Sequence, residues 1–141
     1  NGIVFHLGDF AFGGSDIWNN TRKRLNGTIY LIEGNHDIKQ NGQTKYNLFE
    51  GVFKQLVIKI DCQFILLNHY PFLCYASRER GTWQLFGHVH SGPNSNKGID
   101  VPRLQYLYPT QYDVGVDNNN FTPISYSEVR EKIIKQCTST K

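Results

Sequence analysis

Four short polar segments of this sequence carry most of the residues that could take part in metal or acid–base chemistry. They are LGD at 7–9, EGNHD at 33–37, LNHYP at 67–71 and FGHVH at 86–90. Each follows an apolar run that is typical of a buried strand. Ligands of open α/β sheets bind beyond the carboxyl ends of the strands, so we expect these four segments to converge.

Glycine directly precedes the polar residue in three of the four segments, at Gly8, Gly34 and Gly87. A glycine at the end of a strand allows a sharp turn and a close approach of the backbone to a ligand. Any one segment could also be a simple solvated turn. Their joint occurrence, each time after an apolar run, favours a ligand-binding site over four unrelated turns.

The elements that must position these segments alternate between strand and helix. Apolar runs at 2–10 and 28–33 predict two buried strands, and the residues between them have helical spacing. Ser15 is a candidate N-cap for this helix, and Gly27 closes it. A strand, a helix and a strand within about thirty residues form a βαβ unit, which implies a parallel pair.

The rest of the chain predicts more strands and a terminal helix. Its capping-box residues are Ser125 and Glu128, and one apolar face carries Val129, Ile133 and Ile134. The further expected elements are a short helical stretch at 46–49, strands at 52–60 and 62–69 around a turn at Asp61, strands at 82–90, 103–108 and 112–117, and the helix at 125–136. The sequence therefore predicts one α/β domain over residues 1–141.

Composition narrows the class of protein. The chain has 141 residues, a net charge of +3 and three cysteines, none of them in a C-x-x-C pair. This charge suits an anionic substrate but is small for a dedicated nucleic-acid binder, and the cysteine count argues against a disulfide framework. No apolar run reaches the roughly eighteen residues of a membrane span and no signal peptide opens the chain, which favours a cytoplasmic protein.

The order GD, GNHD, a lone His and GHVH resembles the calcineurin-like metallophosphoesterases, whose motifs are D-x-H, GD, GNH with D or E, His and GHxH. The match runs from Gly8 to His90, and YDVGVD followed by a Pro-Ile-Ser helix start is similar to the tail of small bacterial and phage members. The resemblance implies the fold of that family, a β-sandwich flanked by helices (αββα). It also implies a cytoplasmic location in a bacterial or phage-infected cell.

The family pattern assigns roles to individual residues here. Asp9 would bridge two divalent ions, Asn35, His69 and His88 would complete one metal site, and His90 would bind the other ion. A mixed nitrogen and oxygen set without sulfur suits Mn, Fe, Zn or Ni. His36 would be the general acid of phosphoester hydrolysis by a two-metal-activated hydroxide, and Asp37 would support it as the second catalytic residue.

The D-x-H motif is absent, which leaves the second metal site with only Asp9 and His90. The only histidine before Asp9 is His6, which we interpret as a structural strand residue. We therefore expect that the first strand of the family fold, with its D-x-H, is missing from this fragment.

Substrate preference depends on a second departure from the family. Protein phosphatases of this superfamily continue GD as GD-x-x-D-R-G, whereas this chain reads GDFAFGG. A small phosphoester or a nucleotide is therefore the expected substrate, with phosphodiesters favoured over monoesters and nucleic acid also possible. Arg78 and Arg80 are candidate phosphate-binding residues, and Tyr70 and Trp83 could stack a base.

Two other readings remain open. The chain could be a non-catalytic or one-metal relative that binds phosphate-bearing partners, or a nuclease subunit of the same superfamily. An upstream strand bearing D-x-H would favour the enzyme, and a true start without it would favour the non-catalytic relative. A nuclease subunit would usually add DNA-binding domains, whereas this chain ends at a helix soon after its last strand.

Overall fold

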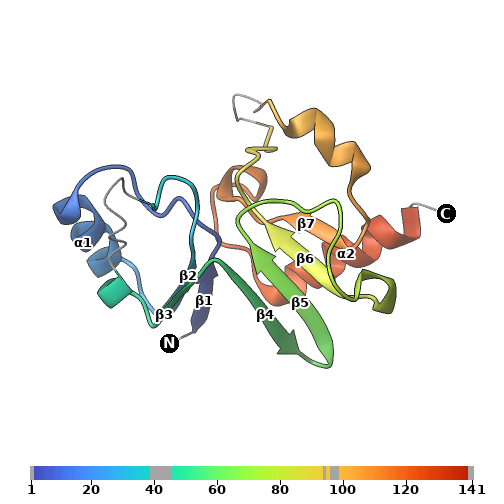
Figure 1. Ribbon diagram of the computed structural model, residues 1–141, viewed down its shortest axis with the longest axis horizontal. Helices are drawn as coiled ribbons and strands as arrows, with labels where there is room; N and C mark the ends of the chain where they lie inside the picture. Colours follow the sequence, from blue (N-terminus) through green and yellow to red (C-terminus); the bar gives the residue numbers. More distant parts are fainter. Residues whose placement is uncertain (1, 39–45, 94, 96–98, 140–141) are drawn as a thin grey trace.

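The computed structural model of the protein describes residues 2–38, 46–93, 95 and 99–139. It is a mixed α/β structure, as the alternation of apolar runs predicts, and its strands form two sheets (Figure 1). In chain order the elements are β1 (Ile3–His6), α1 (Ser15–Arg24), β2 (Thr28–Ile32), η1 (Tyr46–Leu48), β3 (Gly51–Phe53), β4 (Gln55–Ile60), β5 (Gln63–Asn68), η2 (Arg78–Arg80), β6 (Trp83–Phe86), η3 (Val101–Tyr106), β7 (Gln111–Asp113), η4 (Val116–Asn118) and α2 (Tyr126–Ser139).

The first sheet has the order β1-β2-β3, and all of its pairs are parallel. Phe5 pairs with Tyr30 across β1 and β2, and α1 connects these two strands. The predicted βαβ unit is confirmed. Because the strands are parallel, the loops that follow β1 and β2 leave the sheet at the same edge, and these loops carry Asp9 and Asn35.

The second sheet has the order β4-β5-β6-β7. β4 and β5 form the predicted antiparallel hairpin, whose turn residues Asp61 and Cys62 have φ angles of 47° and 65°. Positive φ at both turn residues is typical of a tight two-residue hairpin turn. β5, β6 and β7 are parallel, so the loops after β5 and β6 share one edge and bring His69 and His88 to it.

One predicted strand is in fact two. The apolar run at 52–60 is divided at Lys54, so that β3 pairs with β2 in the first sheet and β4 pairs with β5 in the second. The chain thus passes directly from one sheet to the other. A continuous apolar run does not reveal this crossing, because each half can be a strand by itself.

The main hydrophobic core lies between the two sheets and α2. Leu7, directly after β1, and Ile32 of β2 pack with Ile65 and Leu67 of β5 and with Ile133 of α2. A second cluster beside the first sheet contains Phe10, Trp18, Ile29, Leu31 and Phe49. Through these contacts the loop after β1 is held against both sheets.

Several local predictions are wrong. The strand expected at 112–117 is shortened to β7, because η4 begins at Val116, and α1 ends at the C-cap Leu25 rather than at Gly27. Residues 103–108 are not a strand, because most of them belong to the 3-10 helix η3, in which Pro102 occupies one of the first positions. Proline removes a backbone donor from a ladder and presets φ for a helical first turn. Ser15 is the first residue of α1 rather than its cap, because Gly14 is the N-cap and no side chain caps this end.

The capping box of α2 is present. Ser125 N–H donates to Glu128 Oε2 at 2.9 Å, and Glu128 N–H donates to Ser125 Oγ at 3.3 Å. Val129 and Ile133 are buried as expected, but Ile134 is 46% exposed and lies outside the apolar face. No helix in the described part of the chain is long and apolar enough to cross a membrane.

The two neighbouring isoleucines of α2 give a matched test of the core. We expect Ile133→Ala to lower the free energy of unfolding by about 2–5 kcal/mol, because Ile133 is 1% exposed and its loss leaves a cavity. Ile134→Ala should change it by less than about 1 kcal/mol. Urea denaturation followed by circular dichroism measures both, and equal losses would contradict this packing of α2.

Candidate metal centre

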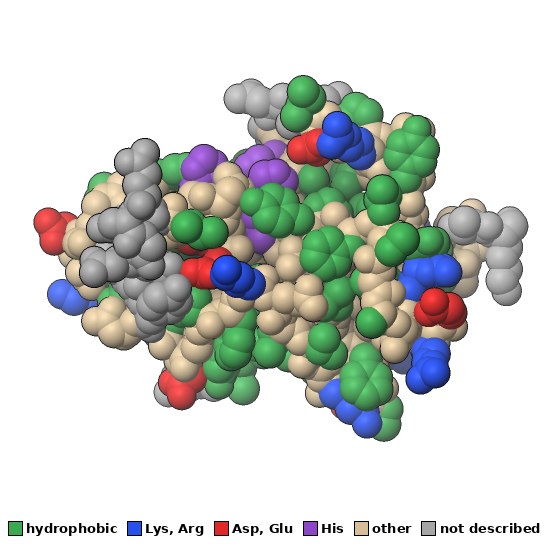
Figure 2. Space-filling view, in the orientation of Figure 1, with side chains coloured by type: hydrophobic (Ala, Val, Ile, Leu, Met, Phe, Trp, Pro, Cys, Tyr) green, Lys and Arg blue, Asp and Glu red, His purple; other side chains and the backbone are tan. Residues whose placement is uncertain are grey.

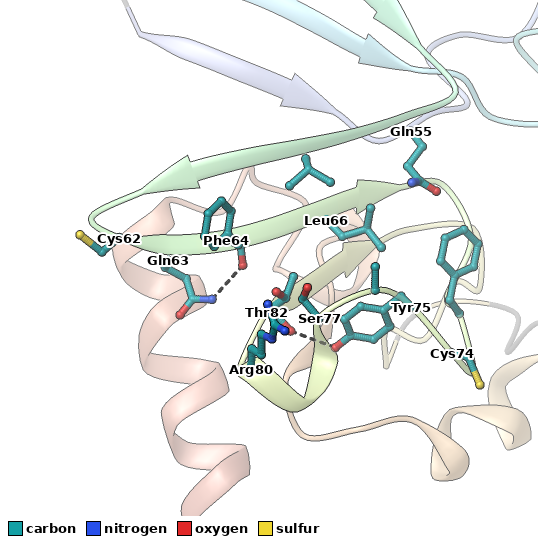
Figure 3. A pocket seen from close by; sticks show the side chains of 13 residues that line it. Gln55, Cys62, Gln63, Phe64, Leu66, Cys74, Tyr75, Ser77, Arg80 and Thr82 are labelled. Carbon is teal, nitrogen blue, oxygen red and sulfur yellow. Dashed lines mark hydrogen bonds between the residues drawn. The ribbon is translucent and has the colours of Figure 1, made fainter.

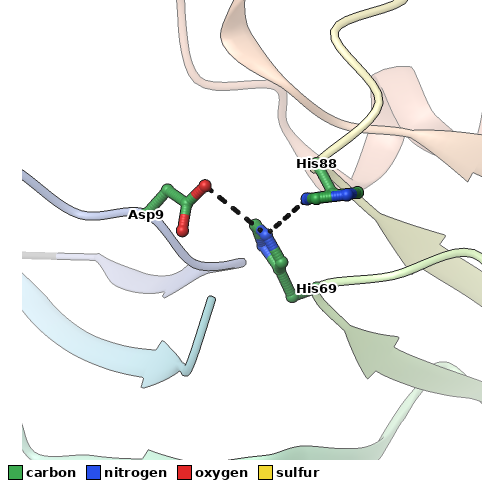
Figure 4. A group of neighbouring side chains, drawn as sticks. All are labelled: Asp9, His69 and His88. Carbon is green, nitrogen blue, oxygen red and sulfur yellow. Dashed lines mark hydrogen bonds and ion pairs between the residues drawn. The ribbon is translucent and has the colours of Figure 1, made fainter. Parts of the chain in front are cut away.

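The ends of β1, β5 and β6 bring three of the predicted ligands together. One ligand atom from each of Asp9, His69 and His88 lies within 4.8 Å of the other two. Asp9 approaches from the loop after β1, and the two histidines approach from the second sheet (Figure 4). Among the described residues, this is the group of histidine, cysteine and acidic side chains that could hold a metal ion.

His69 lies at the middle of the cluster and is 2% exposed. Its Nδ1 lies 2.6 Å from the backbone carbonyl of Leu7, so this nitrogen carries the hydrogen and donates it. The other nitrogen, Nε2, lies 3.0 Å from Asn35 Oδ1, 3.1 Å from His88 Nδ1 and 3.5 Å from Asp9 Oδ2. The Leu7 carbonyl therefore fixes the tautomer that turns a lone pair toward the cluster.

The atoms around His69 Nε2 are nearly all acceptors. Asn35 Oδ1 and Asp9 Oδ2 carry lone pairs, and Nε2 has no hydrogen to donate to either of them in the tautomer that the Leu7 carbonyl fixes. For metal–ligand bonds of about 2.1 Å, neighbouring ligand atoms lie about 3.0 Å apart at right angles and about 3.4 Å apart in a tetrahedron. The observed separations match these values, so the donor set fits one divalent ion with nitrogen and oxygen ligands.

The backbone is strained at three of the predicted ligands. The φ angles of Asp9, His88 and His90 are 54°, 67° and 50°, in the left-handed region. Such conformations cost about 1–3 kcal/mol each and persist where the surrounding structure holds them, commonly at functional sites. The GD loop and the GHVH loop therefore turn sharply at the ligand residues themselves.

Asp37 holds two of these loops together. Its side chain is 1% exposed and accepts backbone N–H groups of Asp9, Phe10 and Gly34, each at 2.8 Å. The carboxylate is thus engaged by the backbone of the GD loop and by its own loop. These contacts favour a positioning role for Asp37, and its predicted catalytic role stays a prediction.

Gly8 and Gly34 lie where no side chain would fit. A Cβ added at Gly8 would be 2.3 Å from His69 Nδ1. One added at Gly34 would be 2.3 Å from Asp9 Oδ1 and 2.9 Å from His69 Cε1. The two glycines therefore allow the GD and GNHD loops to touch beneath the ligands.

Gly34→Ala should disturb the ligands without removing one. The added methyl group displaces the Asp9 carboxylate, so we expect Mn²⁺ affinity to fall by at least about tenfold, as it does when groups that orient ligands are lost. Gly2→Ala is the control, because a Cβ there meets nothing within 4 Å. Isothermal titration calorimetry measures both affinities, and an unchanged affinity in Gly34→Ala would contradict this geometry.

The structure places His36 and His90 beside the cluster but outside the converged group. His36 is exposed, its N–H donates to Asp9 Oδ1 at 2.9 Å, and its ring lies 4.8 Å from that of Phe12. His90 is 66% exposed, and its Nδ1 is 3.8 Å from Asp117 Oδ1. His36 is therefore free to meet a substrate, as its predicted role requires.

Two carboxylates near the histidines were not among the sequence candidates. Asp100 Oδ2 lies 4.0 Å from His88 Nε2, on the side of the ring that faces away from His69. Asp117 lies beside His90 and also accepts Gly92 N–H at 3.1 Å. A carboxylate on the far nitrogen commonly orients a metal-binding histidine. Burial and the neighbouring His69 lower the pKa of His88, which favours the neutral ring that a metal needs.

Arg78 and Arg80 are not brought to this cluster. They form η2 before β6, and Gln63 at the start of β5 donates to the Gly81 carbonyl at 2.8 Å. His69 follows the other end of β5, about 17 Å away at 3.3 Å per residue. Arg78 stacks on Tyr108 at 3.9 Å, and Arg80 lines a separate cavity of about 760 Å³ (Figure 3). Their placement gives no support to a role in binding phosphate at the cluster.

The remaining aromatic and histidine candidates differ in whether they are buried in the fold or exposed near the cluster. Trp83 is 8% exposed and belongs to the core, whereas Tyr70 is 41% exposed and its ring lies 4.6 Å from that of His88. His6 packs edge-on against Phe10, and its buried Nδ1 lacks a hydrogen-bond partner. Burial lowers the pKa of His6, as expected for a neutral ring inside the fold.

Comparisons with known proteins support the fold alone. No protein-family profile matches the sequence, and no curated protein matches it. Among solved structures, the chain is similar to the protein of unknown function AQ665 from Aquifex aeolicus, with 24% sequence identity and a TM-score of 0.63. The match covers 92% of this chain and 75% of that one. The arrangement of strands and helices therefore recurs in a natural protein.

Proposed function

We propose that this protein is a metal-dependent phosphoesterase of the calcineurin-like type, with the αββα sandwich of that family. The observation that carries the proposal is the convergence of lone pairs from Asp9, Asn35 and His88 on His69 Nε2. The four residues come from four different loops, in the order in which the family motifs occur. Phosphodiesters are the favoured substrates, and phosphomonoesters and nucleic-acid ends are alternatives within the same chemistry.

The residues with suitable ligand atoms would form two metal sites. Asp9, Asn35, His69 and His88 would bind one divalent ion, and Asp9 with His90 would contribute to a second. When bound, Mn, Fe, Zn or Ni ions supply Lewis acidity toward the phosphoryl oxygens and generate a strong nucleophile from water at neutral pH.

The other residues serve binding and proton transfer. His36 protonates the leaving oxygen, because its side chain is exposed and its backbone N–H is fixed by Asp9 Oδ1 of the cluster. Asp37 keeps the GD and GNHD loops in register through its three backbone donors. The Leu7 carbonyl holds His69 in the tautomer that can bind metal.

Hydrolysis of bis(4-nitrophenyl) phosphate with and without Mn²⁺ tests this proposal. We expect a Mn²⁺-dependent rate that EDTA abolishes, with a higher kcat/KM for this diester than for 4-nitrophenyl phosphate. A preference for the monoester would overturn the diesterase assignment. Because the expected D-x-H ligands are missing here, the present chain should show at most feeble activity, and the assay is made on the chain extended upstream to include the D-x-H strand. In that extended chain, a rate that EDTA leaves unchanged, or the lack of any hydrolysis at saturating Mn²⁺, would overturn the enzyme.

A non-catalytic relative with one metal is the second candidate. It is favoured by the single converged ligand group within the described residues and by the exposure of His90 outside it. Such a protein would bind one Mn²⁺ per chain and retain phosphate-bearing ligands without turnover. Metal stoichiometry measured together with the hydrolysis assay separates the two candidates.

A further inference from the structure

Two exposed aromatic rings stand next to the ligand cluster. Phe12 follows Asp9 by three residues, is 69% exposed, and lies with its ring centroid 4.8 Å from that of His36. Its only close ring neighbour among the described residues is thus the proposed proton donor. Most large aromatic side chains are well buried, so a phenyl ring left open to water beside a polar site is available to a ligand.

Tyr70 occupies the corresponding position on the second sheet. It follows His69, is 41% exposed, and packs edge-on against the rings of His69 and His88 at 4.9 and 4.6 Å. Its N–H donates to Asn68 Oδ1 at 2.8 Å, and Asn68 Nδ2 donates to the Lys54 carbonyl at 3.1 Å. The turn that presents the Tyr70 ring is therefore fixed rather than adaptable.

The two rings belong to loops of different sheets. Phe12 lies in the loop after β1, which also carries Asp9, and Tyr70 lies in the loop after β5, which also carries His69. These two loops approach the cluster from different sheets (Figure 4). In the space-filling view the histidine side chains gather on one face of the molecule, with hydrophobic side chains beside them (Figure 2).

We propose that Phe12 and Tyr70 bind the base of a nucleotide whose phosphate reaches the ligand cluster. This inference rests on the proposed function and names its substrate class. A flat aromatic base gains more free energy from stacking on such rings than an alkyl or sugar group in the same site would. The net charge of +3 is small for following a polyphosphate strand, which favours a small nucleotide over a long nucleic acid.

Affinities of AMP and ribose 5-phosphate in Mn²⁺, measured by isothermal titration calorimetry, isolate the contribution of the base. We expect AMP to bind at least about tenfold more tightly than ribose 5-phosphate. A tenfold difference in affinity corresponds to the stacking of about one base. Phe12→Leu and Tyr70→Leu should each weaken AMP and leave ribose 5-phosphate unchanged, and the double variant should bind the two about equally. Both rings are exposed, so the variants should fold.

The control is Phe64→Leu. Phe64 is also exposed, at 50%, but it pairs with Lys59 near the far end of β5, and its loss should leave both affinities unchanged. Equal binding of AMP and ribose 5-phosphate to the native protein, or a preference that survives in the double variant, would overturn the base site. An oligonucleotide of adenylates that binds more than about tenfold tighter than AMP would overturn the assignment to a small nucleotide.

Adenosine separates this inference from the metal chemistry. Titrated without metal, it should shift ring resonances in the nuclear magnetic resonance spectrum that are missing from Phe12→Leu and Tyr70→Leu. These shifts do not require the cluster to bind metal, so the base site would remain demonstrated if Mn²⁺ binding failed. If Mn²⁺ bound and adenosine moved no ring resonance, the base site alone would be wrong.

Discussion

Asp9→Asn is expected to abolish the stabilisation of this protein by Mn²⁺ while leaving the metal-free protein as stable as before, or more so. The variant loses the negative charge of the cluster, and its amide can donate a hydrogen bond toward His69 Nε2, where the native carboxylate oxygen lies at 3.5 Å. In the native protein, Mn²⁺ at about one hundred times its Kd should add about 2.7 kcal/mol to the free energy of unfolding. Thermal unfolding in EDTA and in Mn²⁺ measures both effects.

The matched control is Asp16→Asn, which removes the same charge from the exposed first turn of α1. It should retain the full response to Mn²⁺. Phosphodiesterase activity of Asp9→Asn should fall by at least about 100-fold, because a direct ligand matters more than the groups that orient it. If the two variants responded equally to Mn²⁺, Asp9 would not be a ligand.

His36→Ala is expected to lower turnover by about 10²- to 10⁴-fold, the usual contribution of a general acid, with Mn²⁺ affinity unchanged. Its ring lies outside the converged ligands, and its backbone N–H, which contacts Asp9, survives the substitution. The loss should be large for a diester with an alcohol leaving group. It should be small for a 4-nitrophenyl ester, whose leaving group needs little help from a proton.

The dependence on leaving group distinguishes proton donation from positioning. Phe64→Leu serves as the control, because Phe64 is exposed and pairs with Lys59 near the far end of β5, so its loss should leave the rates with both substrates unchanged. An equal loss for both leaving groups in His36→Ala would show that His36 only binds the phosphoryl group. Full activity with both would remove it from the mechanism.

The sequence predicts the strand ends of the site well, because the signal there is local. Each ligand follows an apolar run, and parallel pairing of β1 with β2 and of β5 with β6 then brings these ends to a shared edge. This pairing places Asp9 beside Asn35 at the edge of one sheet and His69 beside His88 at the edge of the other. The packing of the two sheets on each other then brings Asp9 to the histidines. The capping box of α2 also depends on two residues close together in the sequence, Ser125 and Glu128, and it is confirmed.

Contacts between distant segments explain what the sequence does not predict. The Asp37 carboxylate accepts hydrogen bonds from backbone N–H groups of the GD loop, 27 and 28 residues earlier in the chain. Every residue except proline has such an N–H group, so the residue types do not predict this contact. Arg78 precedes GHVH closely in the chain, but η2 lies at the start of β6 and the histidines follow its end. Arg78 is therefore close to the histidines in sequence, but the length of β6 separates them in space.

Crystals of the protein soaked in Mn²⁺ test the central claim most directly through anomalous scattering. A peak is expected among Asp9 Oδ2, Asn35 Oδ1, His69 Nε2 and His88 Nδ1, at about 2.0–2.3 Å from each of them. In the fold, the other three atoms already lie 3.0–3.5 Å from His69 Nε2. Well-diffracting soaked crystals without anomalous density there, or with the manganese bound elsewhere, would contradict the metal centre and the function built on it.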